Sequence, residues 1–112
     1  MRALWFALAA LFAASGGPAL ADAGNFVLVN GAGAPITSVA IRRVGTNDWR
    51  PLSYAASPGG RAMVQFSDPD CAFDIRASLG GTEVTWGGVN LCEVKSVILS
   101  RNASGAVWVD YD

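Results

Sequence analysis

The stretch CAFDIRASLGGTEVTW, residues 71–86, decides the fold of this chain. Its first half alternates strictly, so that one face carries Cys71, Phe73, Ile75, Ala77 and Leu79 and the other carries Ala72, Asp74, Arg76 and Ser78. A period of two is typical of a half-buried antiparallel strand. Gly80-Gly81 then favours a two-residue turn, and Thr82 to Trp86 returns as the partner strand. The stretch therefore predicts a β-hairpin with one buried face.

Short strands are also expected on both sides of this hairpin. Turn residues separate runs with period-two character at 26–30, 36–44, 49–53, 61–66, 91–99 and 106–111. Pro51 favours an edge position for its strand, and Gly87-Gly88 is expected to interrupt the chain after Trp86. Between Val94 and Ile98 the alternation changes phase, which indicates a bulge or a strand buried on both faces.

No segment after residue 21 has the pattern of an amphipathic helix. Seven or eight short strands without a helix predict an all-β fold, a small antiparallel β-sandwich. A small barrel is the alternative. The chain shows no internal repeat and no linker, so residues 22–112 are expected to form a single domain.

Residues 1–21 predict a cleaved signal peptide. Met1-Arg2 is a short positive region, the run from Ala3 to Ala14 is apolar without interruption, and Ala19-Leu20-Ala21 has the small-x-small pattern of a cleavage site. The run is too short to span a hydrocarbon core of about 30 Å, although an uncleaved anchor is the alternative. Cleavage is expected after Ala21, or else after Ala23, which gives a periplasmic or secreted domain.

The composition excludes several function classes. The chain contains no histidine, so hydrolases that use a histidine to activate serine or cysteine are excluded. The net charge is −1, without the basic face typical of nucleic-acid binding and without a polybasic run for an anionic membrane. We therefore expect no catalytic residues, no cofactor, no metal, no nucleic-acid partner and no stable membrane insertion after signal cleavage.

The two cysteines, Cys71 and Cys92, are expected to form a disulfide. Cysteines in an exported domain usually pair. Their separation is not that of a CxxC redox motif, and no basic side chain stands beside either thiol to lower its pKa. A structural bridge is therefore favoured over a redox-active pair.

Carboxylates suggest two kinds of site, and neither pattern is specific. Asp68, Asp70 and Asp74 offer the hard oxygen ligands that calcium prefers, but they lack EF-hand spacing, so a solvated turn is the better interpretation. Asp74 and Glu83 have the residue types of a glycosidase acid pair, but two carboxylates among nine acidic residues do not define one.

The aromatic residues are the best candidates for a binding surface. Most aromatic side chains are expected to pack in the core or across strands. Trp49, which follows the turn at 45–48, and Trp86, which precedes two glycines, are expected to be the most exposed of them. If the runs 36–44 and 49–53 pair, Arg42 or Arg43 would lie near Trp49 and make a cation–π contact. The candidate surface therefore comprises Trp49, Arg42, Arg43, Arg50 and Trp86. The alternative is that Trp49 caps the core.

Four segments of the mature chain carry a family resemblance: FVLVNGAGAPITSVAIRR (26–43), CAFDIRA (71–77), TWGGVNLCEVKSVIL (85–99) and NASGAVWVDYD (102–112). On these segments the chain resembles a family of small exported proteobacterial proteins that has no established activity. The resemblance implies an exported, β-rich domain with its two cysteines joined. Argininosuccinate lyase, a name that such proteins can carry, is not supported, because the chain is too short and lacks the GSSxMPxKxN signature.

Taken together, these patterns favour a non-enzymatic exported domain that binds a protein or a cell-envelope component. The alternative is a module that binds carbohydrate on exposed aromatic rings. An enzyme that relies on carboxylates alone is the third hypothesis.

Overall fold

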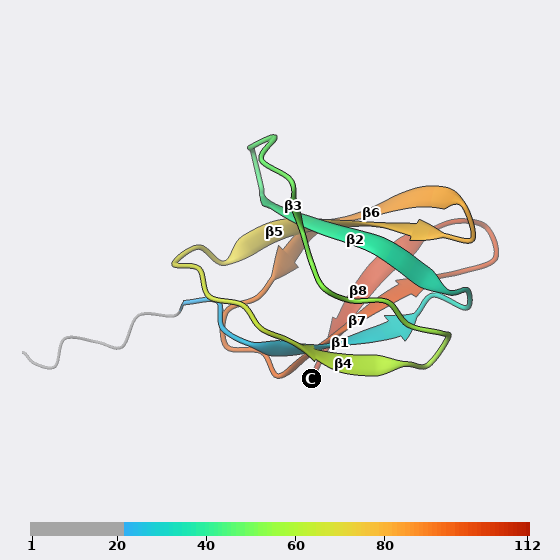
Figure 1. Ribbon diagram of the computed structural model, residues 1–112, viewed down its shortest axis with the longest axis horizontal. Helices are drawn as coiled ribbons and strands as arrows, with labels where there is room; N and C mark the ends of the chain where they lie inside the picture. Colours follow the sequence, from blue (N-terminus) through green and yellow to red (C-terminus); the bar gives the residue numbers. More distant parts are fainter. Residues whose placement is uncertain (1–21) are drawn as a thin grey trace, which may run out of the picture.

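The computed structural model describes residues 22–112, so the predicted signal peptide lies outside the described residues. Two four-stranded sheets pack face to face as a sandwich, with strand orders β4-β1-β7-β8 and β3-β2-β5-β6 (Figure 1). The strands are β1 (Phe26–Gly31), β2 (Ile36–Arg43), β3 (Arg50–Pro51), β4 (Arg61–Val64), β5 (Ala72–Leu79), β6 (Thr82–Asn90), β7 (Ser96–Arg101) and β8 (Val107–Tyr111). The predicted β-sandwich is confirmed, and the described residues form no closed barrel.

The β-hairpin predicted from residues 71–86 is confirmed. β5 and β6 pair antiparallel up to Leu79 and Thr82, and Gly80 and Gly81 have φ of 56° and 92°. Two consecutive positive φ values are what a tight hairpin turn needs, and glycine adopts them without the steric cost of a Cβ.

Two strand boundaries lie four or more residues from the prediction, and the others lie within two residues of it. Gly87-Gly88 does not end the strand, because β6 continues to Asn90 and absorbs the glycines in a register shift against β5. The strand expected from Leu91 begins only at Ser96. Glu93 has φ of 61°, which breaks the extended chain before β7 and leaves Val94 outside the strand. β7 shows no register shift against β1 or β8, so the bulge is absent, and the strand is largely buried on both faces.

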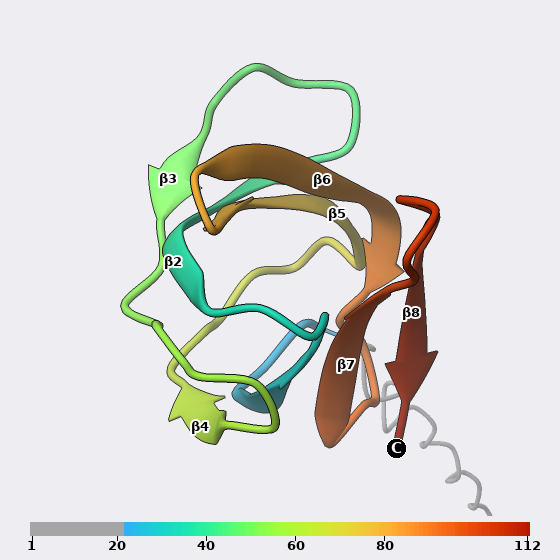
Figure 2. The same cartoon turned by 90° about the vertical axis from the view of Figure 1, so that its right-hand side faces the viewer.

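One pairing is not antiparallel. β1 and β7 run parallel, with Leu28 opposite Val97. Parallel neighbours need a long connection, and here most of the domain, including the whole second sheet, lies between these strands in the sequence. The end-on view in Figure 2 shows both layers and places β8 beside β7.

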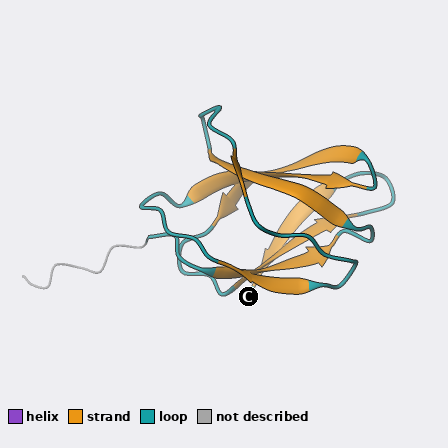
Figure 3. Cartoon of the chain, in the orientation of Figure 1, coloured by secondary structure: helices purple, strands orange, loops and turns teal. Residues whose placement is uncertain are grey.

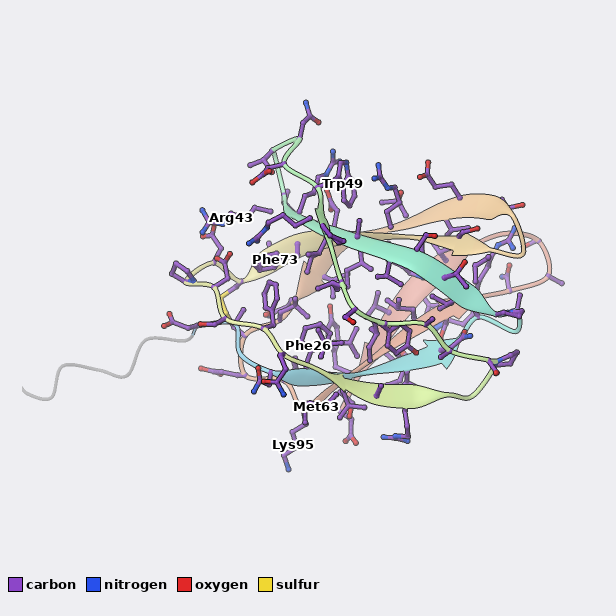
Figure 4. All side chains as sticks on the ribbon, viewed as in Figure 1. Phe26, Arg43, Trp49, Met63, Phe73 and Lys95 are labelled. Atoms are coloured by element: carbon purple, nitrogen blue, oxygen red, sulfur yellow. A yellow bond between two sulfur atoms is a disulfide. The ribbon has the colours of Figure 1, made fainter. Side chains whose placement is uncertain are left out.

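The core lies between the two sheets and is formed by side chains on the inward face of every long strand. Figure 4 shows Phe26 and Phe73 between the layers, and Phe66 makes edge-to-face contacts with both rings. The largest fully buried apolar side chains are Trp86, Phe26, Phe73, Leu28, Ile36, Ile41, Ile75, Leu91, Leu99, Val89 and Val97. Figure 3 shows strands and loops alone in the described chain, and no helix there is long and apolar enough to cross a membrane.

The predicted disulfide is confirmed. Cys71 and Cys92 are bonded, with their Cα atoms 5.1 Å apart. The bridge joins the residue before β5 to the loop after β6. It therefore closes the chain around the central hairpin.

Candidate functional site

A hairpin of β2 and β3 carries most of the candidate residues, as predicted. The two strands pair antiparallel, with Ile41 opposite Arg50. Their connecting loop, residues 44–49, projects beyond the sheet in Figure 1. Thr46 closes the turn, because its Oγ1 and its backbone N–H both donate to the carbonyl oxygen of Arg43, at 2.9 and 3.2 Å. The loop therefore returns the chain to the outer face of the sheet at Trp49.

Two guanidinium groups lie over the indole ring of Trp49. The Cζ of Arg42 is 4.5 Å from the ring centroid, which confirms the predicted neighbour, and the Cζ of Arg76 is 4.2 Å from it. Both distances are in the range of cation–π contacts. Figure 4 shows Trp49 on the outer side of the sheet, away from the core, and its side chain is half-buried.

A carboxylate fixes the position of Arg42. Its Nε lies 2.9 Å from Oδ2 of Asp74, and its Nη1 donates to Oδ1 of Asn47 at 3.2 Å. The other oxygen of Asp74 accepts the backbone N–H of Gly88 at 3.1 Å. Asp74 is itself largely buried on the sheet surface, so Arg42 is anchored to β5 and β6 while its guanidinium covers the indole.

Arg76 is held in a similar way. Its Nε lies 3.2 Å from Oε2 of Glu83 on the neighbouring strand. Asp74 and Glu83, which sequence patterns suggested as an acid pair, therefore each contact a different arginine. We refer to the following residues as the Trp49 surface: Trp49, Arg42, Arg76, Asn47, Asp74 and Glu83.

The other two candidate arginines belong to a separate ionic cluster around Asp68. Nη2 of Arg43 lies 3.0 Å from Oδ1 of Asp68, and its Nε lies 3.2 Å from Oδ2 of Asp70. Nη2 of Arg50 lies 3.4 Å from Oδ2 of Asp68. The Asp68 side chain is only 4% exposed, whereas both arginines are about half exposed. We refer to Asp68, Asp70, Arg43 and Arg50 as the Asp68 cluster.

The Asp68 carboxyl stays ionised in this setting. Burial alone would raise its pKa, but the backbone N–H of Asp70, donating at 2.8 Å, and the guanidinium groups of Arg43 and Arg50 outweigh that effect. The net result is that the pKa of Asp68 is lowered from its usual value. The same contact raises the pKa of Arg43, first through its hydrogen bond to Asp68 and then through the charge of that carboxylate.

The Asp68 cluster borders an open cavity of about 270 Å³, lined by Arg43, Thr46, Asp48, Arg50 and Asp68. The backbone of Asp68 is also tied to the amino-terminal segment, because Ala23 and Asp68 exchange two backbone hydrogen bonds of 2.8 and 3.0 Å. The cluster therefore joins the first described residues to the β2–β3 loop. Its charges are matched internally, which suits a structural role.

The three aspartates considered for calcium do not gather. Asp68 and Asp70 share Arg43, whereas Asp74 binds Arg42 on the sheet surface. Within residues 22–112, no group of three or more histidine, cysteine, aspartate or glutamate residues is placed to hold a metal ion.

The predicted exposure of Trp86 is wrong. Its side chain is 1% exposed and lies in the core. The indole Nε1 donates to the carbonyl oxygen of Ser100 at 2.9 Å, so Trp86 on β6 reaches across the sandwich to β7. The continuation of β6 through Gly87-Gly88 keeps this position inside the sheet instead of at a turn, and Trp86 is not part of a binding surface.

Three surface residues were not predicted from the sequence. Arg76 fell on the polar face of the strand from Cys71 to Leu79, but its position beneath Trp49 depends on the pairing of β2 with β5, which no local pattern reveals. Trp108 and Tyr111 are each 45% exposed on β8, although cross-strand packing was expected for most aromatic side chains. The sequence pattern that could have indicated Trp108 and Tyr111 is the short, apolar strand that carries both of them.

Searches of protein-family models, of curated proteins and of solved structures find no match to this chain. The resemblance to small exported proteobacterial proteins therefore stays a prediction. Any conclusion on function rests on the geometry of the residues themselves.

Proposed function

We propose that this protein is an exported, non-enzymatic domain that binds another protein, or a protein-bearing component of the cell envelope, through the Trp49 surface. The observation that supports this proposal is the contact of Trp49, at the base of the projecting β2–β3 loop, with Arg42 of β2 and Arg76 of β5 on the outer face of the sheet. Tryptophan and arginine are the residues most enriched in the energetic centres of protein interfaces.

The geometry of the arginines adds to this argument. Arg42 and Arg76 are each held by a carboxylate on the sheet, so they are already positioned before a partner arrives. Preorganised side chains lose less conformational entropy on binding than mobile ones do. Each guanidinium keeps further N–H donors beyond those that contact the carboxylates, and these can reach carbonyl or carboxylate oxygens of a partner.

A protein partner fits this surface better than a sugar. Sugar binding favours an aromatic ring that is free of other contacts, whereas the Cζ atoms of two arginines already lie 4.2 and 4.5 Å from the ring centroid of Trp49. Trp86 is buried, so the two indoles that would have formed a platform do not share a surface. The carboxylates nearest to Trp49, Asp74 and Glu83, are paired with arginines, and this pairing favours binding over acid–base chemistry.

Export is part of the proposal. The residue pattern before Asp22 supports it, and so does the Cys71–Cys92 bridge, because disulfides form and persist in oxidising compartments. In the periplasm or outside the cell, the expected partner is another exported or membrane-bound protein.

Partner capture from the native cell envelope tests the proposal. The wild-type protein, Trp49→Ala and Met63→Ala are used as bait, and the captured proteins are identified by mass spectrometry. Met63 is a suitable control because it is 55% exposed on the outer side of the opposite sheet (Figure 4). We expect Trp49→Ala to lose a protein that the wild type and Met63→Ala both retain, while it stays folded by circular dichroism. Equal capture by all three baits would contradict the proposal.

A further inference from the structure

β8 ends one sheet, and its outer edge is open. β8 pairs with β7 in an unbroken antiparallel register. Asp112, the residue after β8, exchanges two backbone hydrogen bonds of 3.2 and 3.1 Å with Ser96, the first residue of β7. Hydrogen-bonded and non-hydrogen-bonded pairs alternate along such a ladder. The backbone groups of Asp110 and Trp108 therefore face β7, and those of Val107, Val109 and Tyr111 face outward. No other described strand pairs with that side.

The same strand carries most of the exposed apolar surface. Five large apolar side chains are exposed in the described residues, and three of them, Val107, Trp108 and Tyr111, lie on β8. Beside the strand, a groove of about 240 Å³ opens toward β6, lined by Trp86, Gly87, Val107, Trp108, Val109 and Tyr111. An open edge beside an apolar groove is a template for an added strand.

The remaining edges carry features that discourage strand pairing. β3 contains Pro51, and β6 contains Gly87-Gly88 at its register shift. β4 begins with the charged Arg61. β8 has no proline, glycine or basic residue, and its single charge is Asp110. Proteins usually protect edges with such devices, so the unprotected edge of β8 is expected to be covered.

We propose that a second copy of this chain covers β8, in a symmetric dimer whose twofold axis passes through Val109. In this register Val109 faces Val109 of the second copy, and Val107 faces Tyr111 of the second copy. All three outward-facing residues of each strand then pair, and each pair exchanges two backbone hydrogen bonds. The β4-β1-β7-β8 sheets of the two copies would then join into one continuous sheet.

The side chains of β8 are complementary to themselves in this register. Trp108 lies opposite Asp110 of the second copy, and the indole Nε1 of Trp108 already donates to a carboxylate oxygen of Asp110 within one chain at 3.1 Å. Val107 opposite Tyr111 is a β-branched and aromatic pair, which is favourable across strands. A shift that centres the axis on Asp110 would set two carboxylates opposite each other, and this arrangement is repulsive.

The groove also accommodates the second copy. Opposed residues of an antiparallel pair point to the same face, so Val107 and Tyr111 of the second copy extend the apolar row that lines the groove. The proposed contact thus buries apolar side chains as well as pairing backbone groups. This interface lies on a different sheet from the Trp49 surface, so it is independent of the proposed partner binding.

Sedimentation of the purified native protein over a range of concentrations tests dimer formation. We expect a reversible shift toward twice the monomer mass, and Val109→Pro should raise the dissociation constant by at least about tenfold, because it removes an outward N–H from each copy. Met63→Ala, on the β4 edge, should leave the dissociation constant unchanged. A wild-type protein that stays monomeric at the highest soluble concentration would overturn the proposal. Binding of a foreign peptide to β8 of such a monomer would not restore it.

Cysteine cross-linking tests the register even if Val109→Pro fails to fold. Trp108 and Asp110 of the second copy would form a non-hydrogen-bonded pair with Cα atoms about 4.5 Å apart, within the range of a disulfide. We expect an intermolecular disulfide in a mixture of Trp108→Cys and Asp110→Cys, and none in either variant alone. Cross-linking of Trp108→Cys or Asp110→Cys with itself, but not in the mixture, would show a different register and overturn the proposal.

Discussion

Trp86→Phe should destabilise the domain by about 2.5 kcal/mol, because Trp86 ties the two sheets together. The indole of Trp86 is fully buried, and its Nε1 donates to the Ser100 carbonyl on the opposite sheet at 2.9 Å. Phenylalanine removes this hydrogen bond, worth about 1 kcal/mol net. It also removes two buried ring carbons, worth about 1.5 kcal/mol at roughly 0.8 kcal/mol per buried carbon group.

Thermal and urea unfolding, followed by circular dichroism, measure this loss. For a domain of this size, 2.5 kcal/mol lowers Tm by roughly 10–20 °C. Trp49→Phe is the matched control, since Trp49 is half-buried on the outer face and phenylalanine keeps a ring for the arginines. We expect it to cost less than about 0.7 kcal/mol. A Trp86→Phe variant as stable as wild type, or a larger loss for Trp49→Phe, would refute the assignment of Trp86 to the core and Trp49 to the surface.

Three further predictions concern the disulfide, the Asp68 cluster and the mature amino terminus. The double variant Cys71→Ala/Cys92→Ala should lose about 2–5 kcal/mol of stability in urea unfolding, and non-reducing peptide mapping should find the bridge in the native protein, whereas free alkylation of both thiols would contradict it. Because the folded pKa of Asp68 is lowered, its stabilising contribution is present above the unfolded value near pH 4 and is lost as pH falls through the folded value. Asp68→Asn should therefore cost about 1–3 kcal/mol at pH 7 and flatten the acid limb of the stability profile; an unchanged profile would argue against the cluster. Amino-terminal sequencing should find Asp22 as the first residue, since Ala23 is buried and hydrogen-bonded to Asp68, and recovery of intact Met1 would indicate an uncleaved anchor.

Local patterns were sufficient to predict much of the fold. The alternation from Cys71 to Leu79 and the glycine pair after it were enough for the hairpin. The number of short strands without a helix was enough for the sandwich class, and two cysteines in a domain predicted to be exported were enough for the bridge. The proximity of Arg42 to Trp49 was also predictable, because a short turn between two strands brings the residues on either side of it together.

Features that depend on non-local pairing were not predictable in this way. The burial of Trp86 depends on how β6 passes through its glycines against β5, and the position of Arg76 depends on the register of β5 against β2. The parallel pairing of β1 with β7 and the open edge of β8 are properties of the sheet order. Hydrophobic periodicity indicates which face of a strand is buried, but it does not indicate which strand lies beside it.

Site-specific photo-cross-linking tests the proposed binding surface most directly. A photoreactive amino acid is placed at Asp48, the exposed neighbour of Trp49, in one variant and at Met63, on the opposite sheet, in another, and both are irradiated in the living cell (Figure 4). The account predicts a discrete cross-linked protein at position 48 that is absent at position 63. Cross-links at position 63 and none at position 48, with both variants folded and equally abundant, would contradict it.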